Sequence, residues 1–131
     1  PYLLGFTCVN DVTARDLQQK DGQWTRAKGF DTFCPVGPFV VEAPQAGDRP
    51  WEGLSIETRV NGQVRQQGNT RDCIFHLPQL LHAITAVMTL EPGDLLATGT
   101  PAGVGRLEAG DRASVTITGV GTLENQVAAE A

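Results

Sequence analysis

The clearest structural signal in the chain is the stretch Ser55-Ile56-Glu57-Thr58-Arg59-Val60-Asn61-Gly62-Gln63-Val64-Arg65-Gln66-Gln67. Apolar and polar residues alternate over residues 55–60, as in a strand with one buried face. Asn61-Gly62 then supplies the two residues of positive φ that a type I′ turn requires, and it leads the chain into residues 63–67. The stretch therefore predicts a β-hairpin.

Further strands are predicted on both sides of this hairpin. Residues 2–9 are apolar and predict a buried strand that stops at Asn10-Asp11. Residues 39–42 follow two prolines and predict a short strand. Toward the C-terminus, strands are predicted at residues 95–98, 112–118 and 122–127, with a glycine-rich loop at residues 99–105. A polar loop is predicted at residues 43–50.

Two short helices and one tight turn complete the predicted elements. Thr13 is predicted to cap a helix, with Asp16 three residues on as a capping-box variant, and the helix breaks near Asp21-Gly22. A second helix is predicted from Pro78 to about Thr89, because apolar residues recur there at helical spacing. Residues 91–94 have the proline and glycine of a type II turn.

Composition predicts one mainly β (α+β) domain over residues 1–131. The chain is 40% hydrophobic and contains 15 glycines and 8 prolines, which favours a turn-rich, β-dominated fold. No apolar run approaches the roughly 20 residues that span a bilayer, and no secretory leader is visible, so we expect a cytoplasmic protein without a membrane partner.

The formal net charge is −5, and the basic residues are scattered. Binding to nucleic acid requires clustered Lys and Arg, so we expect no nucleic-acid partner. A small anionic substrate remains compatible with this charge, because a few cations in one cleft can dominate the local field.

The cysteines and histidines show no metal-binding pattern. Cys8, Cys34 and Cys73 are odd in number and widely spaced, so we expect reduced and mostly buried thiols. His76 and His82 lie six residues apart, which is not a metal-ligating spacing on one helix face. We interpret both as structural or surface residues.

Residues 10–18, Asn-Asp-Val-Thr-Ala-Arg-Asp-Leu-Gln, combine polar groups at a strand–helix junction. Asp11 would lie near a helix N-terminus, where negative charge is favoured. Arg15 and Gln18 are three residues apart on the helix and would share one face. A carboxylate beside a guanidinium and an amide is a plausible site for a metal and an anion. Alternatively, Asp11 is a turn residue, Thr13 a cap and Arg15 a surface charge.

Two further segments could carry chemistry. Residues 98–105, Thr-Gly-Thr-Pro-Ala-Gly-Val-Gly, form a loop whose backbone N–H groups could approach an anion, although a tight crossover between strands would look the same. The loop lacks the Gly-Lys-Ser/Thr ending of a nucleotide P-loop and does not fit the Gly-x-Gly-x-x-Gly fingerprint, so nucleotide binding is disfavoured. Lys28 lies among aromatic residues, where it could be desolvated and stabilise an enolate or carboxylate, or could simply be a surface lysine packed on rings.

Taken together, these segments resemble the fumarylacetoacetate hydrolase family. The matching stretches occur in family order over nearly the whole chain: residues 5–18, 23–35, 60–62, 65–66, 68–70, 74–75, 89–94 and 97–105. The branch that the chain looks most like is 2-hydroxyhepta-2,4-diene-1,7-dioate isomerase / 5-oxopent-3-ene-1,2,5-tricarboxylate decarboxylase. Acylpyruvate hydrolases and oxaloacetate decarboxylases share the same motifs and stay open as alternatives.

The resemblance implies a mixed β-roll or sandwich with short helices, usually as a homodimer. It implies a Mg²⁺- or Mn²⁺-dependent enzyme that isomerises, decarboxylates or hydrolyses 2-oxo or 2-hydroxy-enoic acids in the catabolism of aromatic compounds or small acids. Three carboxylates hold the metal in the family, and Asp11 matches one. The other two, in a Glu-x-Glu pair, and the acid/base His and Glu lie upstream of the first strand, so we expect that the chain lacks the N-terminal part of this catalytic domain.

The resemblance also assigns roles to residues of this chain. Lys28 matches a catalytic lysine that also contacts substrate, and the other substrate-binding positions are Arg15, Gln18, Gly99 and Thr100. The alternative from another functional class is a non-catalytic β-domain that scaffolds or binds an anion, because two expected metal ligands are absent from the chain.

Overall fold

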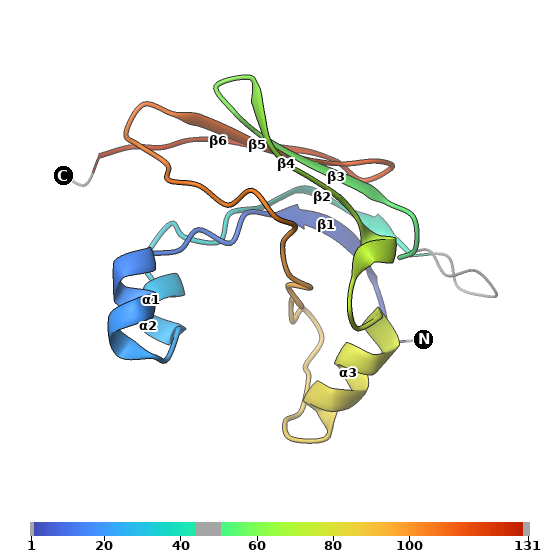
Figure 1. The fold of residues 1–131 in the computed structure, drawn as a ribbon. Helices are drawn as coiled ribbons and strands as arrows, with labels where there is room; N and C mark the ends of the chain where they lie inside the picture. The colour runs from blue at the N-terminus through green and yellow to red at the C-terminus, as the bar shows by residue number, and fades with distance from the viewer. Residues whose placement is uncertain (1, 44–50, 130–131) are drawn as a thin grey trace.

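The computed structural model describes residues 2–43 and 51–129. In chain order, its elements are β1 (Gly5–Val9), α1 (Arg15–Asp21), α2 (Thr25–Lys28), β2 (Val36–Glu42), β3 (Ser55–Val60), β4 (Gln63–Asn69), the 3-10 helix η1 (Thr70–Asp72), α3 (Leu77–Thr85), β5 (Arg112–Ile117) and β6 (Gly121–Gln126). Strands lie together on one side of the molecule and the short helices on the other (Figure 1). The predicted mainly β fold with short helices is confirmed. Apart from Ala43, the predicted polar loop at residues 43–50 lies outside the described residues.

Four antiparallel strands form the larger sheet, in the order β4-β3-β5-β6. Val60 pairs with Gln63 across the first turn, where Asn61 and Gly62 have φ values of 52° and 79°. These positive values are those of a type I′ turn, so the predicted hairpin is confirmed. The two strands predicted at the C-terminus are β5 and β6, and both lie within one residue of the predicted bounds.

The two faces of this sheet differ in polarity. The register places Ile56, Val115 and Leu123 on one face and charged residues such as Glu57 and Glu124 on the other. The apolar face packs on β1, where Cys8 is completely buried, and the buried cluster consists of Cys8, Val115, Val120 and Leu123. Removal of this apolar surface from water is the main force that holds the two layers together.

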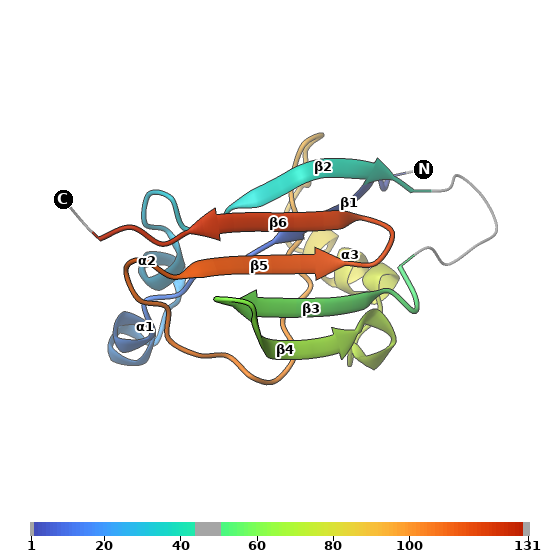
Figure 2. The same ribbon diagram turned by 90° about the horizontal axis from the view of Figure 1, so that it is seen from above.

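β1 and β2 form a second, antiparallel sheet of two strands, which passes beneath the larger sheet and beside β6 (Figure 2). The prediction of a buried strand over residues 2–9 is wrong in two respects. The strand begins at Gly5, and only Cys8 within it is fully buried. β2 begins at Val36 rather than at residue 39, because Val36 pairs with Val9.

The helices follow the predicted signals in part. α1 ends at Asp21, and Gly22 adopts the left-handed conformation expected of a helix stop. Thr13 is not its cap: α1 begins one residue later than a Thr13 cap requires, with Ala14 at the N-cap position and no side-chain capping bond. α3 contains the predicted proline in its first turn but ends at Thr85 rather than near Thr89.

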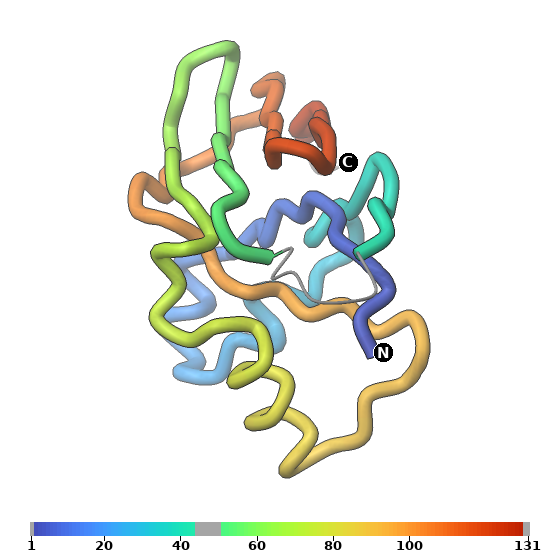
Figure 3. The backbone as a smooth tube through the Cα atoms, turned by 90° about the vertical axis from the view of Figure 1, so that its right-hand side faces the viewer, coloured from blue at the N-terminus to red at the C-terminus, as the bar shows by residue number. Residues whose placement is uncertain are grey.

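The chain between α3 and β5 contains no strand in the described structure. After α3 it turns at the tip of the molecule and returns beneath the sheets to the start of β5 (Figure 3). The predicted turn at residues 91–94 is confirmed, since Gly93 has φ of 101° and Asp94 N donates to the Glu91 carbonyl at 3.0 Å. The predicted strand at residues 95–98 is wrong. A strand requires a partner backbone, and no described strand pairs with this apolar segment.

Two smaller expectations can be compared with the structure. Cys8 is buried, and burial raises the pKa of its thiol, but Cys34 is exposed and Cys73 half-buried, so the expectation of mostly buried thiols is wrong. Both histidines are exposed, which confirms them as surface residues. No helix in the described part of the chain is long and apolar enough to cross a membrane.

Candidate active site

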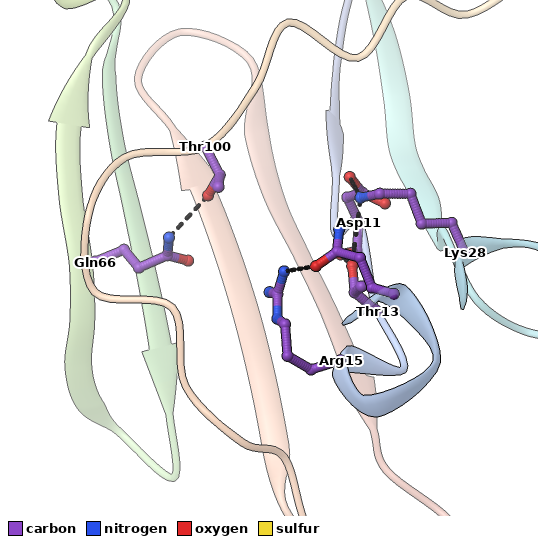
Figure 4. A network of polar contacts seen from close by, with 7 residues as sticks. Asp11, Thr13, Arg15, Lys28, Gln66 and Thr100 are labelled. Carbon is purple, nitrogen blue, oxygen red and sulfur yellow. Dashed lines mark hydrogen bonds and ion pairs between the residues drawn. The ribbon is translucent and has the colours of Figure 1, made fainter. Parts of the chain in front are cut away.

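A broad open cleft lies between the sheets, the helices α1 and α2, and the returning segment. Its lining includes Asp11, Arg15 and Lys28 from one wall and Gln66 and Thr100 from the other. Figure 4 shows these two groups facing each other across the cleft. The structure therefore brings the predicted polar residues of distant segments to one concave region.

The backbone that carries Asp11 is irregular and is held by contacts with two other segments. Asn10 N donates to the Pro35 carbonyl at 3.1 Å, and Ala14 N donates to the Ala27 carbonyl at 2.9 Å. Ala27 lies in α2 and is fully buried. These bonds fix residues 10–14 between the entry to β2 and α2, so the Asp11 side chain projects from a rigid support into the cleft.

Lys28 lies at the end of α2 and forms an ion pair with Asp11 Oδ2. Its ammonium also donates to Thr13 Oγ1 at 3.3 Å, and that hydroxyl donates to the Asp11 carbonyl at 3.0 Å. The Lys28 Nζ lies 5.8 Å from the centroid of the Trp24 ring, within the range of a cation–π interaction. The lysine side chain is 29% exposed, so its ammonium is partly removed from water, and Lys28 lines the cleft.

Asp11 is a suitable ligand for a metal ion, but the described residues do not complete a metal site around it. Carboxylate oxygen is the donor that Mg²⁺ and Mn²⁺ prefer. Lys28 occupies only Oδ2, and Oδ1 of Asp11 has no hydrogen-bond partner within the described residues. However, residues 2–43 and 51–129 contain no group of three or more His, Cys, Asp or Glu placed to hold a metal ion. This part of the chain can therefore supply one ligand to a metal site but does not complete such a site by itself.

Arg15 and Gln18 act as a pair on α1. The Arg15 guanidinium donates to Gln18 Oε1 at 2.5 Å, which confirms that the two side chains share one helix face. Because the amide oxygen accepts from Arg15, the Gln18 NH₂ group is left to donate to another partner. Arg15 lies near Asp11 (Figure 4), and both members of the pair carry N–H groups that can donate to a ligand in the cleft.

The opposite wall is the loop at residues 98–105, which lies against β4. Gln66 Nε2 lies 2.7 Å from Thr100 Oγ1 and 2.8 Å from the Pro101 carbonyl oxygen. A Cβ added to Gly103, which has φ of 101°, would lie 2.2 Å from the Arg65 carbonyl oxygen. Gly99 also has positive φ, of 106°, and nothing lies within 4 Å of where its Cβ would be. Glycine at position 103 thus permits the loop to approach β4 closely, while the backbone of Gly99 is left exposed.

The predicted site residues fall into three hydrogen-bonded groups rather than one. Asp11 and Lys28 contact each other, as do Arg15 and Gln18, whereas Thr100 contacts Gln66 on the far wall. The sequence did not assign Gln66 to the site. Two signals could have found it: its place in the family-like stretch at residues 65–66, and its position on the hairpin, opposite Thr58 on the face that lines the cleft.

Comparisons with known proteins agree with this architecture. A family model described as "Fumarylacetoacetate (FAA) hydrolase C-terminal" matches residues 1–128. A solved structure of 5-carboxymethyl-2-hydroxymuconate delta-isomerase from Mycobacterium smegmatis is 49% identical, with a TM-score of 0.91, over 98% of this chain and 49% of that chain.

Two further relatives are named for other reactions. Maleylpyruvate hydrolase from Sphingobium sp. SYK-6, solved in complex with manganese(II) ion and pyruvate, is 39% identical, with a TM-score of 0.83, over 95% of this chain and 44% of that chain. Oxaloacetate tautomerase from Bacillus subtilis is 45% identical over 96% of this chain and 44% of its own length. The chain spans about half the length of the curated relatives it matches.

Proposed function

The chain belongs to the fumarylacetoacetate hydrolase family, and we propose that it forms part of a divalent-metal-dependent enzyme acting on 2-oxo or 2-hydroxy-enoic acids. The reaction is an isomerisation, a decarboxylation or the hydrolysis of a C–C bond. The names of relatives, an isomerase, a hydrolase and a tautomerase, support the isomerisation and the hydrolysis. The complex of one relative with manganese and pyruvate supports the choice of a metal and a 2-oxo acid.

The observation that carries the proposal is the position of Lys28. Its ammonium is held by Asp11 and Thr13 beside the Trp24 ring and faces the cleft. Each of the three reactions passes negative charge onto the oxygen of the 2-oxo group. A fixed positive charge beside that oxygen stabilises the transition state more than the ground state, which raises the rate. Lys28 is therefore proposed as the catalytic residue of this chain.

The other residues hold the substrate. Arg15 and the Gln18 NH₂ group offer N–H donors to a carboxylate, and guanidinium–carboxylate bonds are among the strongest polar contacts in proteins. Across the cleft, the Thr100 hydroxyl and the exposed backbone at Gly99 bind the other polar end of the substrate. Binding at two walls fixes the orientation of the reacting bond relative to Lys28, which itself lowers the barrier.

Asp11 would contribute its free oxygen, Oδ1, to a Mg²⁺ or Mn²⁺ ion whose other carboxylate ligands lie outside residues 2–43 and 51–129. When bound, such an ion supplies a second positive charge at the oxygens of the 2-oxo acid. Lys28 then has the additional role of holding the Asp11 carboxylate in one orientation through Oδ2. The homodimer and the cytoplasmic location expected from the sequence stay predictions.

Steady-state kinetics test the proposal. The full-length protein should turn over at least one of oxaloacetate, an acylpyruvate and the dienoate 2-hydroxyhepta-2,4-diene-1,7-dioate, and chelation of divalent cations should abolish the turnover. A protein that turns over none of these acids with Mg²⁺ or Mn²⁺ present contradicts the proposal. Binding of such acids without turnover would instead identify the non-catalytic anion-binding domain.

A further inference from the structure

The contacts of Gln66 determine whether the Thr100 hydroxyl donates or accepts in the hydrogen bond between them. The Pro101 carbonyl can only accept a hydrogen bond, so the Gln66 atom 2.8 Å from it is the amide nitrogen. The same nitrogen lies 2.7 Å from Thr100 Oγ1. An amide NH₂ group only donates, and therefore Thr100 Oγ1 accepts. The Pro101 carbonyl thus fixes which atom of the Gln66 amide is the nitrogen and which is the oxygen.

The proton of the Thr100 hydroxyl is consequently directed away from Gln66. Within the described residues, no acceptor for this proton lies within hydrogen-bonding distance. A hydroxyl whose oxygen is already occupied by a donor prefers an acceptor for its proton. A ligand that binds this hydroxyl in the cleft would therefore offer it an accepting oxygen, such as that of a carboxylate or a carbonyl.

The strand that carries Gln66 is shaped for this contact. The β3–β4 register shifts between Thr58 and Arg59, so that Thr58 pairs with Gln66 and Arg59 with Val64. The extra residue is Arg65, whose carbonyl meets Gly103 of the loop. Gly68, two residues after Gln66, leaves room for the Pro101 ring, since an added Cβ would lie 2.8 Å from Pro101 Cβ. β4 thus holds the loop at three points, of which only Gln66 determines the direction of a hydroxyl proton.

We propose that Gln66 is a positioning residue for substrate recognition: it anchors the loop at residues 98–105 and fixes the Thr100 hydroxyl as a hydrogen-bond donor to an anionic or carbonyl end of the substrate. The inference rests on the proposed function, because Thr100 is assigned there to the substrate. It adds a specificity rule, since a substrate with a donor at this end is disfavoured.

Two isosteric substitutions in the full-length protein test the inference. Gln66→Met removes both donated bonds and should raise KM for the accepted 2-oxo acid by about tenfold, with kcat changed by less than about threefold. Gln66→Glu should raise KM further, because its carboxylate accepts the Thr100 proton and repels the Pro101 carbonyl. Gln67→Met is the matched control: Gln67 is the next residue and bonds to Glu57 on the opposite face of β4 at 2.9 Å. It should leave KM unchanged.

A double-mutant cycle with Thr100→Val separates positioning from general structural support. Once the hydroxyl is absent, Gln66→Met should raise KM by less than about threefold. An equal increase in both backgrounds would show that Gln66 does not act through Thr100 and would overturn the inference.

Hydrogen exchange gives a readout that does not require turnover. Gln66→Met, but not Gln67→Met, should accelerate amide exchange in the peptide that covers residues 98–105 by about tenfold. If exchange is accelerated while no 2-oxo acid is turned over, the anchoring holds and the proposed function fails. If the loop exchanges at the same rate in both variants, the anchoring itself is wrong.

Discussion

Asp11 and Asp111 each lie beside the end of a strand, but their carboxylates are used differently. Asp111 precedes β5, and both its oxygens are occupied: Oδ1 accepts from Asn61 Nδ2 at 2.7 Å and Oδ2 from Glu108 N at 2.8 Å. Asp11 follows β1, and only Oδ2 has a partner in the described structure. Asp11 lines a cleft together with other polar residues, such as Arg15 and Gln66.

The difference indicates how a structural carboxylate can be told from a functional one. The hydrogen bond from the Glu108 N–H lowers the pKa of Asp111 most, and the bond from Asn61 lowers it further. The charge of the nearby Arg65 lowers this pKa by a smaller amount. These bonds lie within the turns that join the strands, so they stabilise the corner of the sheet. An oxygen without a protein partner that faces a cleft is instead available to a ligand. The following predictions test this contrast.

The largest effect is expected from Asp11→Ala. In the full-length protein, it should abolish Mg²⁺ binding in calorimetry and lower turnover by at least about 1,000-fold, because a charged metal ligand is lost. The melting temperature should change little, since the Asp11 side chain is 42% exposed. Asp16→Ala, an exposed carboxylate on α1, is the control and should bind Mg²⁺ normally. An unchanged Mg²⁺ affinity in Asp11→Ala would contradict the interpretation of Asp11 as a functional carboxylate and of Asp111 as a structural one.

Lys28→Met should have the next largest effect. It removes the charge that stabilises the transition state but keeps most of the packing on Trp24, so kcat should fall by about 100-fold while KM changes by less than about threefold. Lys20→Met, at the exposed end of α1, serves as the control in the same kinetic assay. If kcat of Lys28→Met stays within tenfold of the parent for every accepted substrate, Lys28 is a structural partner of Asp11 and the site assignment fails.

Thr100→Val is expected to act on binding rather than on chemistry. The hydroxyl contacts the substrate in ground state and transition state alike, so KM should rise by about tenfold, at a cost of about 1–3 kcal/mol for the lost polar contact. Thr118→Val, at the exposed β5–β6 turn, should leave KM unchanged. A fall in kcat with unchanged KM would assign Thr100 to the chemical step instead.

The smallest effect is expected from Asp111→Asn, and it should appear in stability alone. The pKa of Asp111 is lowered in the folded state, so its ionised form stabilises the fold above the ordinary carboxyl pKa of about 3.9. That contribution is lost as the pH falls from there through the folded pKa. The parent should therefore melt above the variant at about pH 6, and the difference should shrink below about pH 4. A difference that is independent of pH would contradict this account, as would a loss of turnover at neutral pH.

Predictions from neighbouring residues succeeded where the conformation is local. The Asn61-Gly62 turn, the turn at residues 91–94 and the end of α1 at Gly22 all depend on φ values that a few adjacent residues set. The strand predicted at residues 95–98 failed because an apolar run becomes a strand only with a partner, and none lies beside it in the described structure. The prediction that Thr13 caps α1 was wrong because contacts outside the helix compete for its hydroxyl. That hydroxyl donates to the Asp11 carbonyl and accepts from Lys28.

By itself, the sequence determined the mainly β class, the hairpin, the turns and, through its motifs, the family. The tertiary structure alone decided which side chains meet. Lys28 reaches Asp11 across 17 residues, and Gln66 reaches Thr100 across 34. Contacts of this kind depend on how sheets, helices and loops pack, and one residue of register would turn Gln66 to the other face of β4. Local preferences act over about four residues, so they fix turns and helix ends but cannot place two distant segments on the walls of one cleft.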